Sequence, residues 1–182
     1  MMKKTFLILF LVTAAGAPAI GCKEAPTEAQ PTSTAIATAD LSAEVSARVD
    51  TALGDYEALR AALAGDRLGE VAAIATRLER SASAAKAGAP SSIASRLDEM
   101  VTAAARLKVG GSADDQRRTF GDLSRAVVSL LSEQSTLARG RYVFQCPMAQ
   151  GYQKWVQTGE RLENPYMGGR MLRCGSSSEW SP

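Results

Sequence analysis

The chain has 182 residues, enough for one modest domain, with 21 lysine and arginine residues, 19 aspartate and glutamate residues and no histidine. No basic patch or stripe of the kind that nucleic-acid-binding proteins carry is visible. Without histidine the usual serine and cysteine triads lack their base, and neither paired carboxylates nor a phosphate-binding loop is found. We therefore expect neither an enzyme nor a nucleic-acid-binding protein.

The N-terminus is typical of an exported protein. Lys3 and Lys4 precede an apolar run over residues 5–15, which is too short to span a bilayer as a helix. Small residues follow as far as Gly21, so residues 1–21 are predicted to be a signal peptide that is removed.

Cys22 directly follows this segment, as in a lipobox, where the cysteine after the cleavage site is acylated. Ala19 stands where a lipobox usually has leucine, and ordinary secretory cleavage after Ala17 or Ala19 is the alternative. Lys23 is typical of lipoproteins sent to the outer membrane. We therefore expect lipidation of Cys22, an anchor in the membrane, and a position in the cell envelope on the outer membrane, facing the periplasm.

Residues 22–39 predict a disordered tether. The segment is rich in proline, threonine and alanine and shows no hydrophobic periodicity. Its expected role is to hold the following domain off the membrane.

Residues 40–140 predict an antiparallel four-helix bundle in a mainly α fold. Apolar residues recur at steps of three and four, which places them on one face of each helix. Asp40 is the expected N-cap of the first helix, and Ser91 or Ser92 that of the third. The charges of Arg117 and Arg118 are expected on a solvated face. The expected helices span about 41–64, 68–86, from 91 or 92 to the glycines at 110 and 111, and 114–138.

Residues 141–182 differ in composition and predict a small irregular or β segment packed on the bundle. Six aromatic residues and three methionines lie here, together with Cys146 and Cys174. Alternating apolar side chains predict a short strand over 141–146, and a second strand is expected over 153–158. If 170–174 forms a helical turn, Met171 and Cys174 fall on one side of it.

The sulfur atoms of this tail indicate a site for a soft metal ion such as Cu(I) or Ag(I). Thiolate and thioether ligands select soft ions, and a chain without histidine must build such a site from sulfur. The predicted ligands lie in two groups that folding has to bring together. They are Cys146, Met148, Met167, Met171 and Cys174.

Other interpretations of the same residues stay open. In an exported protein Cys146 and Cys174 can form a structural disulfide, which would make the protein a structural or interaction lipoprotein without metal. The methionines can instead fill gaps beside aromatic residues of the core. A disulfide and a metal site can also coexist, because Met148, Met167 and Met171 would still offer three thioethers. A redox enzyme is disfavoured, since the chain has no CxxC motif.

Three motifs of the tail stand out: Cys146-Pro147-Met148-Ala149, then Asn164-Pro165-Tyr166-Met167-Gly168 after Trp155, then Met171-Leu172 followed after one residue by Cys174-Gly175. Over about residues 45–175 the chain resembles a domain of unknown function that is found alone in exported proteins. The same domain occurs at the C-terminus of some periplasmic adaptors of copper and silver (Cus-type) efflux systems.

The resemblance implies a helical bundle capped by a Cys/Met-bearing segment in a heavy-metal context. It marks Cys146, Met148, Met171 and Cys174 as ligand positions, whereas Met167 occupies a position where other members often carry an aromatic residue. The chain has no adaptor hairpin or barrel before the domain. The resemblance therefore implies a partner of a heavy-metal efflux component and not an efflux adaptor itself.

Overall fold

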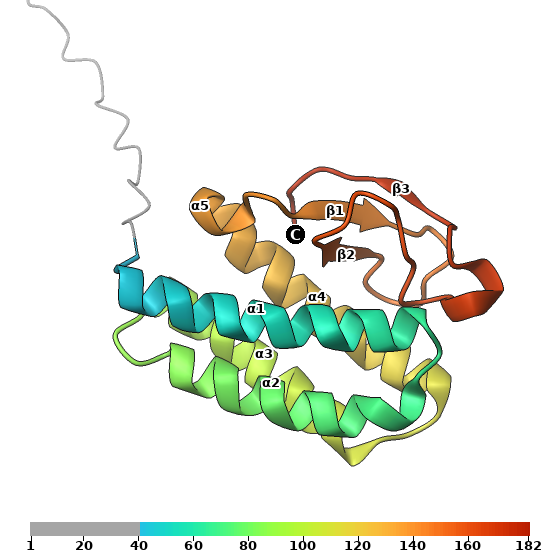
Figure 1. Ribbon diagram of the computed structural model, residues 1–182, viewed down its shortest axis with the longest axis horizontal. Helices are drawn as coiled ribbons and strands as arrows, with labels where there is room; N and C mark the ends of the chain where they lie inside the picture. The colour runs from blue at the N-terminus through green and yellow to red at the C-terminus, as the bar shows by residue number, and fades with distance from the viewer. Residues whose placement is uncertain (1–40) are drawn as a thin grey trace, which may run out of the picture. The chain divides into compact units, whose positions relative to one another are not determined.

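The computed structural model describes residues 41–182, so the predicted signal peptide, the predicted lipidation site Cys22 and the predicted tether over 22–39 lie outside the described residues. The described part is mainly helical, with 62% of its residues in helices, and ends in a small antiparallel sheet of three strands (Figure 1). This confirms the predicted class, mainly α with a C-terminal β segment. Between residues 41 and 182, no helix combines the length and apolar character that a membrane span requires.

Within residues 41–182, five α-helices come first, and three strands follow in the last quarter of the chain. The helices are α1 (Ala43–Ala64), α2 (Val71–Ala85), α3 (Ser91–Val109), α4 (Ala113–Glu133) and α5 (Ser135–Ala138). The strands are β1 (Tyr142–Gln145), β2 (Lys154–Gln157) and β3 (Ser176–Ser177), and two 3-10 helices are η1 (Leu68–Glu70) and η2 (Gly168–Met171).

The long helices match the predicted spans, but their ends differ in three places. The N-cap of α1 is Ser42, whose hydroxyl accepts a hydrogen bond from the first turn at 3.3 Å, and not Asp40, which lies outside the described residues. Ser91 and Ser92 are already helical, so neither caps α3. The predicted fourth helix is interrupted at Gln134, where φ is −129° and ψ is 78°, and only the short α5 continues it.

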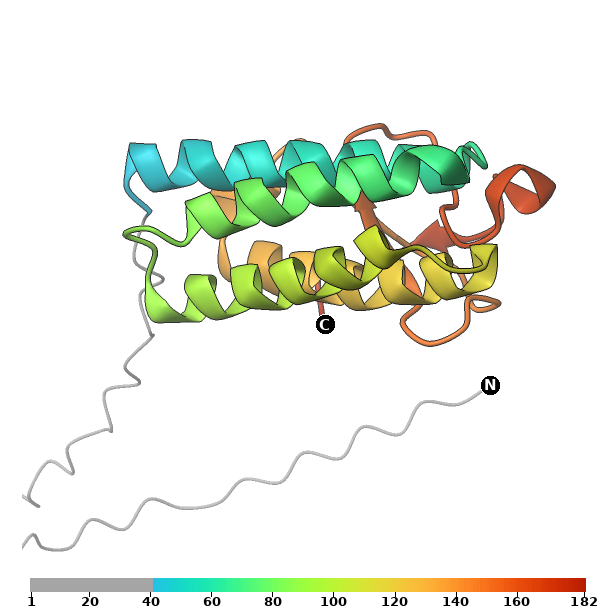
Figure 2. The same ribbon diagram turned by 90° about the horizontal axis from the view of Figure 1, so that it is seen from below.

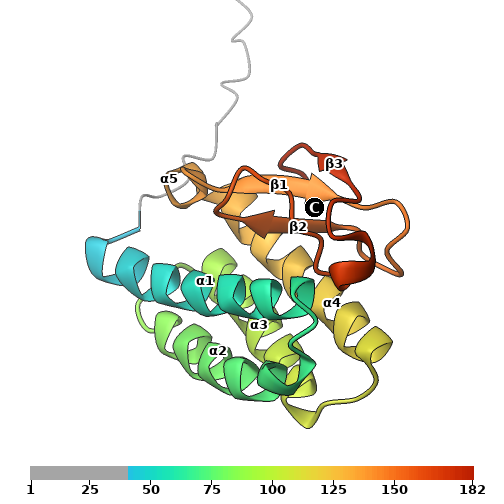
Figure 3. The same cartoon turned by 45° about the vertical axis from the view of Figure 1, so that its right-hand side comes forward.

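The four long helices pack in chain order, each antiparallel to the one before it (Figures 1 and 2). Buried alanines let them approach closely, and each alanine buries little apolar area. α1 and α4 approach each other only locally, whereas β2 packs on α4 and also touches α1 (Figure 3). The sheet therefore packs mainly on α4, and α1 is the second helix that it contacts.

The sheet has the order β2-β1-β3, and all its pairs are antiparallel. The strands predicted over 141–146 and 153–158 correspond to β1 and β2, and β3 was not predicted. Phe144 pairs with Trp155 across the sheet, and their rings stack at 5.8 Å between centroids. Val143 is buried as well as Phe144, so β1 is covered on both faces and not on one face as the alternation suggested.

Tyr56 joins the first helix to the tail. Its ring is buried and stacks on Phe120 of α4 at 5.5 Å. Its hydroxyl lies 2.9 Å from the Ser124 Oγ of α4 and accepts a hydrogen bond from the Val156 N–H of β2 at 3.1 Å. One phenol thus connects α1, α4 and β2, which fixes where the sheet sits on the helices.

We expect the Tyr56 hydroxyl to make the fold sensitive to alkali. Burial raises its pKa well above the ordinary value, with a smaller contribution from Glu57, while its hydrogen bonds and Arg60 act in the opposite direction. The folded state therefore favours the protonated phenol. Its contribution to stability is complete below the unfolded-state pKa of about 10 and falls above it by up to about 1.4 kcal/mol per pH unit.

Urea unfolding of the wild type and of Tyr56→Phe between pH 8 and 11 measures this contribution. The variant should be less stable at pH 8 by about 1–3 kcal/mol, because the Val156 N–H loses its acceptor, and it should lose less stability as pH rises. Tyr142→Phe, at an exposed tyrosine, is the control and should change the slope far less. Parallel pH profiles for the wild type and Tyr56→Phe would contradict the prediction.

Candidate functional site

The structure brings the two cysteines of the tail together. Cys146 follows β1 and is completely buried, and Cys174 follows η2 and is half-buried. Their Sγ atoms lie 3.8 Å apart, although 28 positions separate them in the chain. This separation is longer than an S–S bond of about 2.05 Å and brings the two sulfur atoms into contact.

Short backbone contacts position each cysteine. The Cys146 N–H donates to the Gln153 carbonyl at 3.0 Å, which extends the β1–β2 hairpin by one pair. The Cys174 N–H donates to the Met171 carbonyl at 2.9 Å, which closes a turn over the predicted 170–174 segment. Gly175 has a φ of +137°, and a Cβ there would lie 2.6 Å from the Gln145 carbonyl oxygen. Only glycine therefore lets the chain after Cys174 lie this close to β1.

Asn164 ties the segments around Cys174 to each other. Its side chain is completely buried, and its Nδ2 donates to the Cys174 carbonyl at 2.6 Å. Its Oδ1 accepts hydrogen bonds from the N–H groups of Tyr166 at 2.8 Å and Met167 at 3.1 Å. Its own N–H donates to the Leu172 carbonyl at 2.8 Å. Asn164 thus holds the 164–174 loop in shape through both the nitrogen and the oxygen of its side-chain amide and through its backbone N–H.

Two helix arginines hold this loop against the helices. Arg60 of α1 is 4% exposed, pairs with Glu57 at 2.8 Å and donates from Nη1 to the Glu163 carbonyl at 3.0 Å. Arg117 of α4 is 7% exposed and donates from Nε to the Pro165 carbonyl at 3.2 Å. The expectation that Arg117 lies on a solvated face is therefore wrong. Its spacing from the buried Phe120 and Ser124, at steps of three and four, was the sequence signal for an inward side chain.

Cys174 is not arranged as a reactive cysteine. The hydrogen bond between the two thiols raises the pKa of Cys174, and partial burial and the neighbouring Cys146 raise it further. Reactive cysteines carry a lowered pKa, because the thiolate is the nucleophile. Cys174 therefore lacks the lowered pKa of a reactive cysteine.

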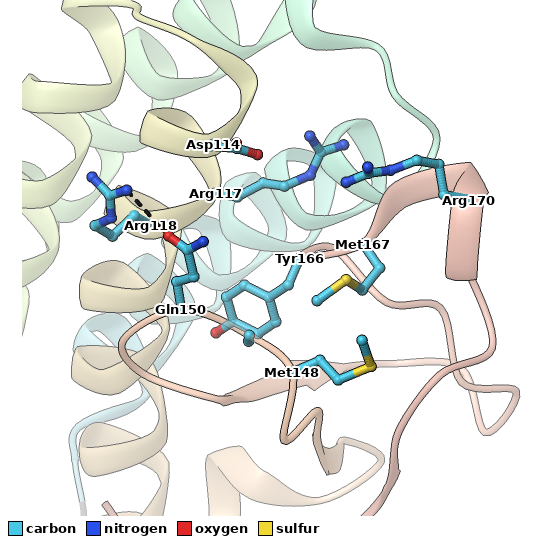
Figure 4. Close-up of a pocket in the computed structure, with 9 residues that line it drawn as sticks. Asp114, Arg117, Arg118, Met148, Gln150, Tyr166, Met167 and Arg170 are labelled. Atoms are coloured by element: carbon cyan, nitrogen blue, oxygen red, sulfur yellow. Dashed lines mark hydrogen bonds between the residues drawn. The ribbon is translucent and has the colours of Figure 1, made fainter.

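The three methionines of the tail lie in two different places. Met148, 57% exposed, and Met167, partly buried, line one hollow beside the ring of Tyr166 (Figure 4). Met171 is 41% exposed on the turn that leads to Cys174. Exposure argues against core packing for Met148 and Met171, and Met100 is the methionine that fills the helical core.

Of the five predicted ligands, the structure brings Cys146 and Cys174 into direct contact. The three methionines lie in two other places. Met171 belongs to the same turn as Cys174, and Met148 shares a hollow with Met167. Over residues 41–182, no three or more cysteine, aspartate or glutamate side chains form a group that could hold a metal ion. An ion on the thiol pair would have to take further ligands from methionine, the backbone or solvent.

The hollow at Met148 and Met167 also has a cationic wall. It has a volume of about 150 Å³ and lies where the first turns of α4 meet the tail. Three arginines line it, Arg117 and Arg118 from α4 and Arg170 from η2 (Figure 4). None of the three was a predicted site residue.

Comparison with known proteins gives no family assignment. No family model, no curated protein and no solved structure matches the chain.

Proposed function

We propose that the protein is a lipid-anchored envelope protein that binds one soft metal ion, Cu(I) or Ag(I), at the Cys146–Cys174 pair. In this proposal acylated Cys22 anchors the chain to the outer membrane, residues 22–39 give reach, and the helices form an antiparallel four-helix bundle that serves as a rigid support. The bound ion would be captured for, or passed to, a heavy-metal efflux component. The observation that carries the proposal is the 3.8 Å contact between the two Sγ atoms.

The sulfur separation fits two ligands of a single ion. With a metal–sulfur distance of about 2.3 Å, two sulfurs on a tetrahedral ion lie about 3.8 Å apart, and on a trigonal ion about 4.0 Å. The observed 3.8 Å needs little movement of either side chain. Thiolates select soft ions over the harder divalent metals, which prefer imidazole or oxygen ligands.

Burial of one thiol and exposure of the other supports ion capture. Cys146 lies in the core, where its sulfur is fixed, while Cys174 is half-buried and gives solvent access to the pair. Met171 is exposed and lies in the same turn as Cys174, the more accessible thiol, and it is our choice for a third ligand. Met148 follows Cys146 by two residues and is the other candidate.

Anaerobic titration of the reduced protein with Cu(I) against a competing chelator tests the proposal. We expect Cys174→Ser to weaken binding on the order of 100-fold or more, because losing even an indirect support of a metal ligand costs about 10–100-fold. Met171→Leu should weaken binding by about tenfold if its thioether is a ligand. Met100→Leu, a change at the core methionine, is the control and should leave the affinity unchanged. Equal affinity for the wild type and Cys174→Ser would overturn the proposal.

The same contact favours a second candidate, a structural disulfide between Cys146 and Cys174. Export exposes the pair to oxidising conditions, and closing a loop of 28 residues would stabilise the fold by about 3–4 kcal/mol. Thiol counting on protein isolated from the envelope separates the two functions. Two thiols per chain and a stoichiometric ion support metal binding. No thiols, together with a loss of stability on reduction, support the disulfide.

A further inference from the structure

The hollow between the first turns of α4 and the tail has two unlike walls (Figure 4). One wall carries the guanidinium groups of Arg117, Arg118 and Arg170. The other carries the thioethers of Met148 and Met167 and the buried ring of Tyr166. Neither Cys146 nor Cys174 lines this hollow, so it is separate from the thiol pair.

Arg117 presents a fixed cation to the hollow. The side chain is more than nine-tenths buried, its Nε donates to the Pro165 carbonyl at 3.2 Å, and its Nη2 pairs with Asp66 Oδ1 at 2.5 Å. In the part of the chain that the structure describes, Nη1 has no hydrogen-bond acceptor, and it is not closed off from solvent. Because Nη2 also donates to the Leu63 carbonyl at 3.5 Å, Nη1 is the group of this oriented guanidinium that is available to a ligand.

Arg170 reaches over the same space from η2. Its guanidinium points toward that of Arg117 (Figure 4), and it forms no ion pair with any residue between 41 and 182. Arg118 differs, because it already pairs with Asp115 at 3.3 Å and donates to Gln150 Oε1 at 3.2 Å.

The acidic groups nearby are mostly engaged. Asp66 is held by Arg117 and Asp115 by Arg118, which leaves Asp114 as the carboxylate that lines the hollow itself. Two guanidinium groups that face each other repel, and an anion between them would remove that repulsion and accept from both.

We propose that this hollow binds a small organic carboxylate with an apolar body. A carboxylate matches the planar donor fork of arginine, and Arg117 and Arg170 would hold its two oxygens. The apolar body would lie against Met148, Met167 and Tyr166, a wall that an inorganic oxyanion would leave unused. The volume of about 150 Å³ is well below the roughly 300–1,000 Å³ of pockets for drug-sized ligands, so the ligand is small.

Titration of the metal-free, full mature chain with 4-methylpentanoate tests the proposal, with ¹³C-labelled methionine methyl groups as the NMR readout. The signals of Met148 and Met167 should shift and saturate, while the signal of the core Met100 should stay in place. 4-Methylpentanamide has the same shape without charge and should not bind. Sulfate and acetate should bind at least tenfold more weakly, because they lack the apolar body.

The decisive variant is Arg170→Gln, which changes an exposed side chain and should not disturb folding. We expect it to weaken binding by about tenfold, the effect of losing one charge-assisted hydrogen bond. Arg161→Gln removes an exposed arginine that does not line the hollow and should leave binding unchanged. Equal binding by Arg170→Gln and the wild type, or equal binding of the amide and the carboxylate, would overturn the proposal. Sulfate binding as tightly as 4-methylpentanoate would show an oxyanion site and overturn the organic ligand.

Discussion

We expect Asn164→Ala to lower the free energy of unfolding by about 3–6 kcal/mol, because one buried and two partly buried backbone groups lose their partner at once. Each loss costs about 1–3 kcal/mol, and the two partly buried groups lie toward the lower end of that range. The three groups are the Cys174 carbonyl and the N–H groups of Tyr166 and Met167. Asn164 is completely buried, so water cannot replace the lost bonds without opening the loop. Urea unfolding followed by tryptophan fluorescence measures the change.

Two further variants show that the loss comes from these hydrogen bonds. Asn164→Asp keeps the acceptor for Tyr166 and Met167 but places a buried carboxylate against the Cys174 carbonyl oxygen, so it should be costly at neutral pH. Its cost should fall as the pH is lowered, because the neutral acid can again donate to that carbonyl. Gln153→Ala removes an exposed amide that also bonds to a backbone carbonyl of the tail, at 3.0 Å from Pro147 O, and should cost less than about 1 kcal/mol. Similar losses for Gln153→Ala and Asn164→Ala would show that Asn164 has no special role.

The same residue links stability to the proposed metal site. Asn164 holds the carbonyl of Cys174, and the turn that it stabilises carries Met171. If this turn loosens, the two Sγ atoms no longer stay 3.8 Å apart, and the proposed ion loses its preformed pair of ligands. Preorganisation of this kind is what turns scattered sulfurs into a site.

The helices could be predicted because their signal is local. Leu53, Leu59 and Leu63 repeat along α1 at helical spacing, and each is buried. The ends of the helices were less predictable, since a cap is decided by one or two dihedral angles. Ser42 and Asp40 are both good N-cap residues, and sequence alone does not separate them.

The tail could be predicted only in part, because its structure depends on contacts between distant residues. The alternation around Phe144 predicted β1, whereas β3 has two residues and forms only through pairing with Phe144 and Gln145. The buried roles of Arg117 and Asn164 arise from partners 48 and 10 positions away, respectively, and a polar residue in a sequence is expected at the surface by default.

Gly168→Ala should lower the free energy of unfolding by about 2–4 kcal/mol. Gly168 has a φ of +59°, and a Cβ there would lie 2.0 Å from Asp66 Oδ1 and 2.6 Å from Arg117 Nη2. The methyl group would therefore separate the Asp66–Arg117 pair and leave the buried Arg117 without its carboxylate, while Asp66 is half-exposed, so the cost of breaking the pair stays below that of a fully buried pair, about 3–5 kcal/mol. It would also displace Asp66 Oδ2 from the Gly169 N–H, a bond of 2.8 Å that holds η2 to the helices.

Gly140→Ala is the matched control for this prediction. Gly140 also has a positive φ, +73°, but a Cβ there would meet no atom within 4 Å, so only backbone strain of about 1–2 kcal/mol is expected. The difference between the two variants then measures the contact with Asp66 and Arg117. In an Asp66→Ala background, the cost of Gly168→Ala should fall toward that of Gly140→Ala, because the closest obstacle to the methyl group is gone. An unchanged cost in that background would show that the ion pair does not depend on the glycine.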